Sequence, residues 1–302
     1  MMTGISEQCV NRWHSILPQL GISPQFLTGK HTACPICGGK DRFRFDDKEG
    51  RGTFFCNQCK AGNGVDLVMR VHGKTFREAA EMIREVAPGA EPRTPKREMS
   101  DERRIESLRE MWKQSAPVSE GDDAGRYLIS RSIPAPFSPS LRFIPKLKVT
   151  GAPVDHLAAM IAMVRDPLGE PLTLHRTYLA NGRKAEIDNP RRMMPGKTPH
   201  GSYIALSPPA EEMGVAEGIE TALRAQLRFG VPVWSLINAD GLKAFTPPPI
   251  VTRLRIFGDN DHNYTGQLAA FALANRMAIK NDHIAVSVEI PPDAGTDWAD
   301  VE

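Results

Sequence analysis

Two Cys-x-x-Cys pairs near the start of the chain constrain its fold more than any other feature. Eighteen residues separate the second cysteine of the first pair from the first cysteine of the second pair. The four cysteines are Cys34, Cys37, Cys56 and Cys59. Two such pairs present four thiolates to one tetrahedral ion, which is the ligand set of a structural zinc site. We therefore predict a zinc ribbon that binds Zn²⁺ through these cysteines.

The segment between the two pairs predicts the hairpin of this ribbon. Residues 41–46 alternate polar and aromatic side chains, and residues 52–56 are rich in aromatic residues, so two strands are expected around a turn at 47–51. The candidates for contact with bases and phosphates are Phe43, Phe45, Phe54, Phe55, Arg42 and Arg44. The alternative is that half of the rings pack behind the zinc. His31 and His72 flank the cluster, but four cysteines already complete its shell, so neither is predicted as a ligand.

Composition and proline placement predict several domains. The chain has 302 residues, of which 41% are hydrophobic, and it contains no apolar run of the roughly 18 residues that span a bilayer. Only Cys9 lies outside the two pairs, so we do not expect a disulfide framework. We expect a cytoplasmic protein that does not contact a membrane. Residues 89–100 are rich in proline and charge and predict a linker. The expected domains are residues 1–88, 101–207 and 208–302.

Charge is divided unevenly among these regions. Residues 1–97 hold 15 basic and 10 acidic side chains, residues 98–210 hold 16 and 13, and residues 211–302 hold 7 and 13. An excess of Lys and Arg over the first two thirds favours a path for a phosphate backbone, although a solvated surface gives a similar count. The acidic last third favours bound cations.

The last region alternates strand-like and helix-like segments. Strands are expected at 214–216, 231–237, 253–257 and 284–290, with helices at 219–229 and 265–280. This order predicts an α/β sheet, so the fold class is a multidomain α/β protein with a zinc ribbon, a basic α+β middle region and a C-terminal α/β domain. Glu217, Asp259 and Asp261 follow two of the strands. Side chains at the carboxyl ends of such strands gather at one edge, so we expect these carboxylates to converge and to bind Mg²⁺ or Mn²⁺.

These motifs carry a family resemblance. Residues 215–223 read VAEGIETAL and residues 256–270 read IFGDNDHNYTGQLAA, and both resemble the Toprim domain of bacterial primases, topoisomerases and related nucleases. With the Cys-Pro-x-Cys ribbon ahead of them, the chain resembles the zinc-binding DNA primases of phages, plasmids and other mobile elements. The segments 175–185 (HRTYLANGRKA) and 193–197 (MMPGK) look like the basic part of that family's polymerase core.

The resemblance implies synthesis of short RNA primers on single-stranded DNA from nucleoside triphosphates. In this interpretation Asp259 and Asp261 hold the catalytic metal, and Glu217 holds metal or accepts a proton. Asp297 is a further acid by analogy with the family's late acidic motif. The cations expected to bind nucleotide or nucleic acid are Arg176, Arg183, Lys184 and Lys197.

One position departs from the family pattern. Many Toprim primases carry an acid four positions after the first glutamate, where this chain has Thr221, and the nearby acid is Glu220. Glu220 compensates for the missing acid, caps its helix or is a solvated charge, and we favour the last two.

Two other functions remain open from the sequence. One is a Toprim nuclease or topoisomerase-like DNA enzyme, and the other is a noncatalytic zinc-ribbon adaptor of a mobile element. The sequence contains no Gly-x-x-x-x-Gly-Lys-Ser/Thr loop of a helicase motor. A separate replicative helicase and a single-strand-binding protein are therefore expected partners.

Overall fold

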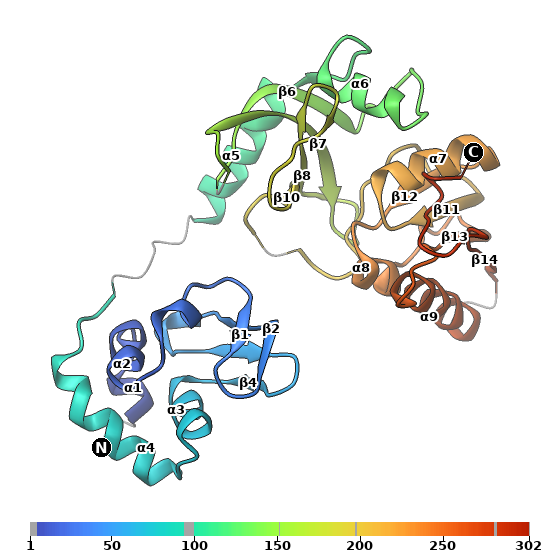
Figure 1. The fold of residues 1–302 in the computed structure, drawn as a ribbon. Helices are drawn as coiled ribbons and strands as arrows, with labels where there is room; N and C mark the ends of the chain where they lie inside the picture. Colours follow the sequence, from blue (N-terminus) through green and yellow to red (C-terminus); the bar gives the residue numbers. More distant parts are fainter. Residues whose placement is uncertain (1–4, 94–99, 151, 197, 281–282, 302) are drawn as a thin grey trace. The chain divides into compact units, whose positions relative to one another are not determined.

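The computed structural model describes residues 5–93, 100–150, 152–196, 198–280 and 283–301. The chain divides into two compact units, Met1–Glu98 and Met99–Glu302 (Figure 1). Half of the predicted linker, residues 94–99, lies outside the described residues. Within the described ranges, no helix is both long enough and apolar enough to cross a membrane.

A four-stranded antiparallel sheet forms the centre of the N-terminal unit. Its order is β1-β2-β3-β4, with strands at Thr32–Cys34, Gly38–Phe45, Phe54–Cys56 and Lys60–Gly62. The predicted hairpin forms, because β2 and β3 pair antiparallel with Phe43 opposite Cys56. The three-residue strands β1 and β4 were not predicted, since so short a segment carries no period-2 pattern.

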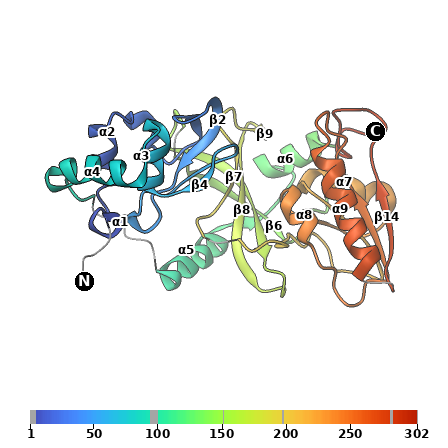
Figure 2. The same ribbon diagram turned by 90° about the horizontal axis from the view of Figure 1, so that it is seen from below.

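Four helices lie beside this sheet (Figure 2). They are α1 (Ile5–Gln8), α2 (Trp13–Gln19), α3 (Gly64–His72) and α4 (Phe76–Val86). Asn63 and Thr75 begin α3 and α4 with capping boxes, which satisfy the free N–H groups of each first turn. The fully buried Trp13 packs so closely on Gly52 and Gly64 that a Cβ at either glycine would overlap its ring. The N-terminal unit therefore has a hydrophobic core of its own, to which Cys34 and Cys56 belong.

An antiparallel sheet forms the first half of the second unit. Its order is β10-β8-β7-β6-β5, with β9 paired to β8. The strands are β5 (Ala116–Pro117), β6 (Leu141–Lys148), β7 (His156–Arg165), β8 (Pro171–Ala180), β9 (Arg183–Lys184) and β10 (Arg191–Met193). Two helices accompany it, α5 (Asp101–Gln114) and α6 (Asp123–Ser130).

A parallel four-stranded sheet forms the second half of this unit. Its order is β12-β11-β13-β14, with strands at Val233–Ser235, Glu212–Ala216, Arg253–Phe257 and Ala285–Glu289. Helix α7 (Ile219–Phe229) covers one face, and α8 (Ala239–Ala244) and α9 (Thr265–Lys280) lie on the other (Figure 1). Alternation along β11 explains this, because Val215 packs in the core with α9 while Ala216 packs in the core with α7.

The two halves of the second unit share one core. Leu128 of α6 and Met160 of β7 lie in the same buried cluster as Ala216 of β11 and Ala222 of α7. The boundary predicted at residue 207 lies inside this compact unit. This shared core holds the carboxyl edge of the parallel sheet next to the antiparallel sheet.

Candidate active site

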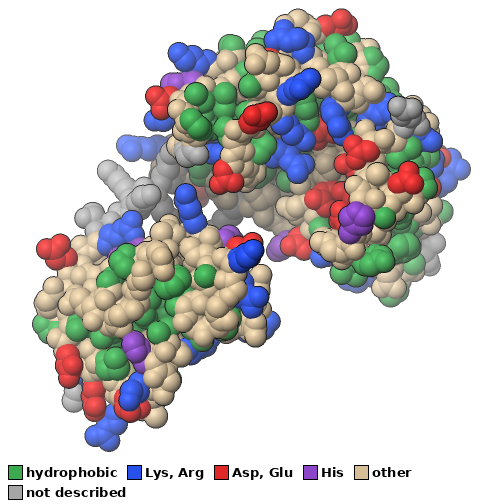
Figure 3. Space-filling view, viewed as in Figure 1, with side chains coloured by type: hydrophobic (Ala, Val, Ile, Leu, Met, Phe, Trp, Pro, Cys, Tyr) green, Lys and Arg blue, Asp and Glu red, His purple; other side chains and the backbone are tan. Residues whose placement is uncertain are grey.

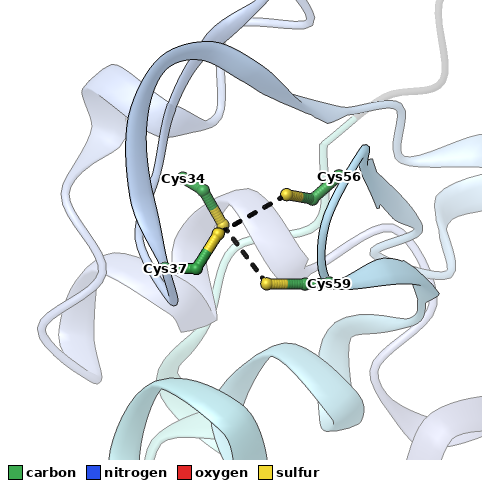
Figure 4. Close-up of side chains that lie close together, drawn as sticks. All are labelled: Cys34, Cys37, Cys56 and Cys59. Carbon is green, nitrogen blue, oxygen red and sulfur yellow. Dashed lines mark hydrogen bonds between the residues drawn. The ribbon is translucent and has the colours of Figure 1, made fainter.

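The four cysteines of the ribbon converge on one point. Their sulfur atoms all lie within 4.8 Å of one another, with Cys34 Sγ 4.0 Å from Cys59 Sγ and Cys37 Sγ 3.8 Å from Cys56 Sγ (Figure 4). A tetrahedral zinc ion with Zn–S distances of about 2.3 Å requires sulfur separations of roughly 3.8 Å. The donor set and its spacing therefore fit Zn²⁺, which would join the β1–β2 and β3–β4 turns.

Burial separates the aromatic residues of the ribbon. Phe43, Phe45 and Phe54 are buried, whereas Phe55 is 42% exposed. The first three pack in the core of the unit, one ring more than the half that the alternative in the sequence analysis expected. Phe55 is the ring that remains a candidate for stacking on a base, and Arg44 lies opposite it on β2.

The predicted carboxylates of the second unit lie at one edge of the parallel sheet. Glu217 follows β11, and Asp259 and Asp261 follow the neighbouring strand β13. Asp297 follows β14, which pairs with the other side of β13. The four side chains therefore come from adjacent strand ends. The α/β order predicted this position for Glu217, Asp259 and Asp261, whereas Asp297 was selected from the family resemblance.

Main-chain and side-chain hydrogen bonds hold these loops together. The Asn260 N–H donates to Thr296 O at 2.9 Å, and the Asn260 side chain donates to Pro291 O at 2.8 Å. Asp261 Oδ2 accepts the Gly266 N–H at 2.8 Å at the start of α9. A Cβ at Gly266 would lie 2.7 Å from Asp259 O, so this position requires glycine. The loop that carries Asp297 is thereby fixed beside the one that carries Asp259.

Mutual repulsion and burial alter the acidity of this edge. Burial, followed by the charges of Asp297, Glu217 and Asp261, raises the pKa of Asp259 to about 7. Burial also raises the pKa of Glu217, with Asp261 adding to the effect, and burial raises the pKa of Asp297. Because carboxyls that titrate so high are poorly solvated as anions, a divalent cation would relieve the repulsion.

The arrangement fits a magnesium or manganese ion. Asp259 Oδ1 is buried and has no hydrogen-bond partner among the described atoms, and carboxylate oxygen is the donor that both ions prefer. The carboxylates are more widely spaced than the cysteines, since no three of them form a tight cluster of potential ligands in the described residues. Of these four carboxylates, Asp259 is the one with a buried oxygen that lacks a partner in the described residues.

The predicted cations have different surroundings. Arg183 is exposed on β9, whereas Arg176 donates to Met193 O at 2.8 Å and to Tyr178 Oη at 3.1 Å. Lys197 lies outside the described residues. Arg and Lys side chains gather over the antiparallel sheet, beside acidic side chains of the parallel sheet (Figure 3).

Glu220 occupies a different environment from the one favoured by the sequence analysis. It is 6% exposed, Lys184 Nζ lies 3.2 Å from its Oε1, and the Tyr127 hydroxyl donates to the same oxygen. Burial alone would raise the pKa of Glu220, but Lys184 and Tyr127 together lower it below its ordinary value. The expectation of a solvated charge is therefore wrong, because α6 and β9 supply partners from distant parts of the chain. Glu220 does lie in the first turn of α7, where a capping charge was expected.

Arg191 is a site residue that the sequence analysis did not select. It is exposed at the start of β10. Its positive charge opposes the rise in the pKa of both Glu217 and Asp259. In the described residues it has no hydrogen-bond or ion-pair partner, unlike Arg192, which donates to three main-chain carbonyls. The adjacent pair Arg191-Arg192 after Pro190 was the available signal.

Three family models match successive parts of the chain. Residues 29–65 match the zinc-binding domain of primase-helicase, residues 102–204 match a domain of unknown function (DUF7146), and residues 212–302 match the Toprim domain. The chain therefore carries a match to a Toprim domain in its last third and a match to a primase-type zinc ribbon near its start. The predicted recognition of these two domains is confirmed. Glu217, Asp259, Asp261 and Asp297 all lie within the Toprim match.

Several solved DNA primases are similar to this chain at low sequence identity. A DNA primase domain from Pseudomonas aeruginosa is 14% identical over 65% of this chain and 73% of its own, with a TM-score of 0.44. The zinc-binding and RNA polymerase domains of the Aquifex aeolicus primase are 13% identical over 99% of this chain and 81% of their own, with a TM-score of 0.42. The primase fragment of the bacteriophage T7 primase-helicase is 16% identical over 89% of this chain and 92% of its own, with a TM-score of 0.38.

Proposed function

We propose that this protein is a DNA primase, an enzyme that synthesises short RNA primers on single-stranded DNA from nucleoside triphosphates. The observation that carries the proposal is the acidic edge in a chain that also bears a primase-type zinc ribbon. Glu217, Asp259 and Asp297 come from adjacent strand ends, and Asp259 Oδ1 is buried and has no partner in the described residues. Carboxylates in this arrangement are suited to nucleotidyl transfer, which depends mainly on positioning and charge neutralisation.

The residues of the chain have separate tasks in this reaction. Asp259 and Asp261, with Glu217 and Asp297, would hold Mg²⁺ or Mn²⁺, which when bound neutralises the triphosphate and favours in-line attack by a 3′-hydroxyl on the α-phosphate. Burial raises the pKa of Glu217, which makes its carboxylate a stronger base toward that hydroxyl's proton. The exposed Arg191 is placed to attract the negative phosphates.

The ribbon supplies the template contact in this proposal. Phe55 offers a flat apolar face to a base. Arg44, which lies opposite Phe55, already pairs with Asp46, with Nε 2.5 Å from Oδ1. The same proposal includes a cytoplasmic location and, as partners, a separate replicative helicase and a single-strand-binding protein. A pull-down from replicating cells that recovers neither partner would count against that part of it.

Primer synthesis tests the proposal directly. Purified protein is incubated with single-stranded DNA, Mg²⁺ and labelled nucleoside triphosphates, and Asp259→Ala/Asp261→Ala is compared with wild type. We expect short products from wild type and a loss of at least 100-fold in the double variant, since each carboxylate holds the ion that neutralises the triphosphate. Asp293→Ala is the matched control, because Asp293 is an exposed acid in the loop after β14.

The outcomes separate the proposal from its alternatives. Products that persist in the double variant would place the chemistry elsewhere or in a contaminant. An absence of products from wild type on many templates, with Mn²⁺ also offered, would contradict primase activity by this chain. Strand cleavage in the same reactions would instead favour a Toprim nuclease.

A further inference from the structure

Helix α9 carries apolar residues on two opposite faces. Its inner face is buried, with Leu273 and Met277 in the core that it forms with the parallel sheet. A helix on a protein surface ordinarily turns polar and charged residues outward, and one that is apolar all round is ordinarily covered on both sides. The outer face of α9 instead carries large apolar side chains that are 57–74% exposed, which are those of Tyr264, Leu268, Phe271 and Ile279. This outer face therefore has the composition of a contact surface.

The exposed residues form one strip along the helix, which we call the outer stripe. An α-helix turns once in 3.6 residues, so positions three, four or seven apart share a face. Leu268 and Phe271 lie four and seven positions after Tyr264, and the exposed Asn275 and Ile279 continue the strip at intervals of four. The Leu268 N–H donates to Tyr264 O at 3.0 Å, which places Tyr264 one turn before Leu268. The outer stripe therefore runs the length of α9.

No charged residue belongs to the outer stripe. All of α9 lies in the described part of the chain, and its charged residues are Arg276 and Lys280. Arg276 points away from the stripe, because its guanidinium donates to Lys243 O at 3.1 Å and to Phe245 O. Lys280 ends the helix beyond Ile279. An uncharged strip can meet a copy of itself without setting like charges against each other.

The outer stripe is self-complementary about its midpoint, between residues 271 and 272. When two identical helices pack antiparallel about a two-fold axis, each position faces the one equally far from the midpoint on the other copy. Tyr264 then faces Ile279 of the second copy, and Leu268 faces Asn275. The two Phe271 rings meet near the axis, where offset or edge-to-face contact stabilises a pair of rings. Every large apolar side chain of the stripe is covered in this arrangement.

The area of the stripe is sufficient for a dimer of modest affinity. A large side chain offers about 150–250 Å², so the exposed parts of these four amount to roughly 500 Å² per copy. Two copies would together bury roughly 1,000 Å², which is about the least expected of a specific interface. Exposed apolar patches of this size often mark interaction surfaces. We therefore expect association in the micromolar range.

We propose that the outer stripe of α9 is a dimer interface, on which a second copy of this chain packs its own α9 antiparallel about a two-fold axis. The occupant follows from the symmetry of the stripe about its midpoint, from its lack of charge and from its area. This inference goes beyond the proposed function and does not depend on it, because association of two copies requires no catalysis.

Sedimentation of the zinc-loaded full chain tests the interface. Velocity runs over about 1–200 µM measure the dissociation constant of the dimer for wild type, Phe271→Glu and Leu227→Glu. We expect a wild-type dimer that Phe271→Glu weakens about 30-fold or more, since a central aromatic contact is lost and two carboxylates meet near the axis. Leu227→Glu is the matched control, because Leu227 is 49% exposed on α7 at the other face of the sheet. Circular dichroism should show the same helical content in all three proteins.

A charge pair tests the antiparallel register. Leu268→Glu should weaken the dimer about tenfold or more, and adding Asn275→Lys should restore much of the loss, because each glutamate then faces a lysine of the second copy. Positions seven apart on one helix are too distant to pair within a chain, so the recovery reports contact between copies. In a parallel pair each position faces itself, and the double variant would dimerise more weakly than Leu268→Glu alone.

Three results would overturn the inference. The first is a wild type that stays monomeric over the whole range, which would leave the stripe to another occupant. The second is a dimer that folded Phe271→Glu does not weaken. The third is a double variant that dimerises no better than Leu268→Glu, which would exclude the antiparallel register. None of these results bears on primer synthesis, so each is distinct from a failure of the proposed function.

Discussion

Glu220 and Lys184 show how residue-level interpretation depends on partners that the local sequence does not reveal. Lys184 was expected to bind phosphates, yet its ammonium group lies 3.2 Å from a carboxylate that is almost fully buried. The third member, Tyr127, lies 93 positions before Glu220 in the chain. No local spacing indicates this cluster. These contacts join α6 and β9 to the first turn of α7, which begins shortly after Glu217.

Removing the cation should destabilise the second unit. Lys184→Met leaves the Glu220 carboxylate buried beside Tyr127 without a positive charge, so we expect a loss of about 2–4 kcal/mol in the free energy of unfolding. Adding Glu220→Gln should recover part of that loss, because the buried group is then neutral. Denaturant unfolding monitors all three proteins. Arg183→Met, on the same short strand but exposed, should change stability little, and an equal loss there would contradict the ion pair as the cause.

Asp259 should make stability depend on pH when no divalent ion is added. Its pKa is raised to about 7 in the folded protein, above the ordinary value of 3.8. Between these values the native state binds more protons than the unfolded state, so this group's contribution is full below pH 3.8 and is lost as pH rises through 7. Asp259→Asn removes the titration and should gain stability relative to wild type, on the order of 2 kcal/mol at pH 8.

Unfolding of both proteins at pH 4.5 and pH 8, with the zinc retained, measures this difference. Added Mg²⁺ should then stabilise wild type at pH 8 more than Asp259→Asn. A gain for the variant that is equal at both pH values would indicate a packing effect instead of a titration.

At the scale of secondary structure, sequence patterns predicted the parallel sheet far better than the ribbon. The expected segments 219–229, 253–257 and 265–280 form α7, β13 and α9 with those bounds, because long apolar periods and buried strands leave a clear signal. The same alternation placed Phe43 and Phe45 on one face of β2, and both are buried. It did not predict β1, β4 or the role of Trp13, which depends on two distant glycines.

The two faces of the ribbon sheet should respond differently to the same substitution. Phe55→Ala removes an exposed ring on β3, so we expect stability to change by less than about 0.5 kcal/mol and single-stranded DNA binding to weaken by about 1–3 kcal/mol. Phe45→Ala removes a ring that is 1% exposed and should cost about 3–5 kcal/mol of stability. Fluorescence anisotropy with labelled oligonucleotides measures binding. Unchanged affinity in folded Phe55→Ala would exclude stacking by this ring.

At the scale of the whole chain, the order of ribbon, middle region and α/β domain could be predicted because each carries its own signal. The cysteine spacing identified the first, and the acidic strand ends identified the last. Sequence did not reveal that residues 99–302 form one compact unit, because Leu128 and Ala216 meet in a core that no local pattern records. For the same reason, a pocket lined by His175 and Glu217, which come from different sheets, was not predicted.

This division into two units predicts two separate unfolding transitions. The buried cluster that contains Trp13 and the cysteines lies entirely in the first unit, and the other buried clusters lie in the second. Because four thiolates fit one zinc ion, metal binding contributes folding free energy to the first unit alone. Differential scanning calorimetry should therefore show that a strong zinc chelator, or Cys56→Ser, abolishes one transition and shifts the other by less than about 2 °C. A single transition whose temperature shifts on zinc removal would show instead that the two units unfold together.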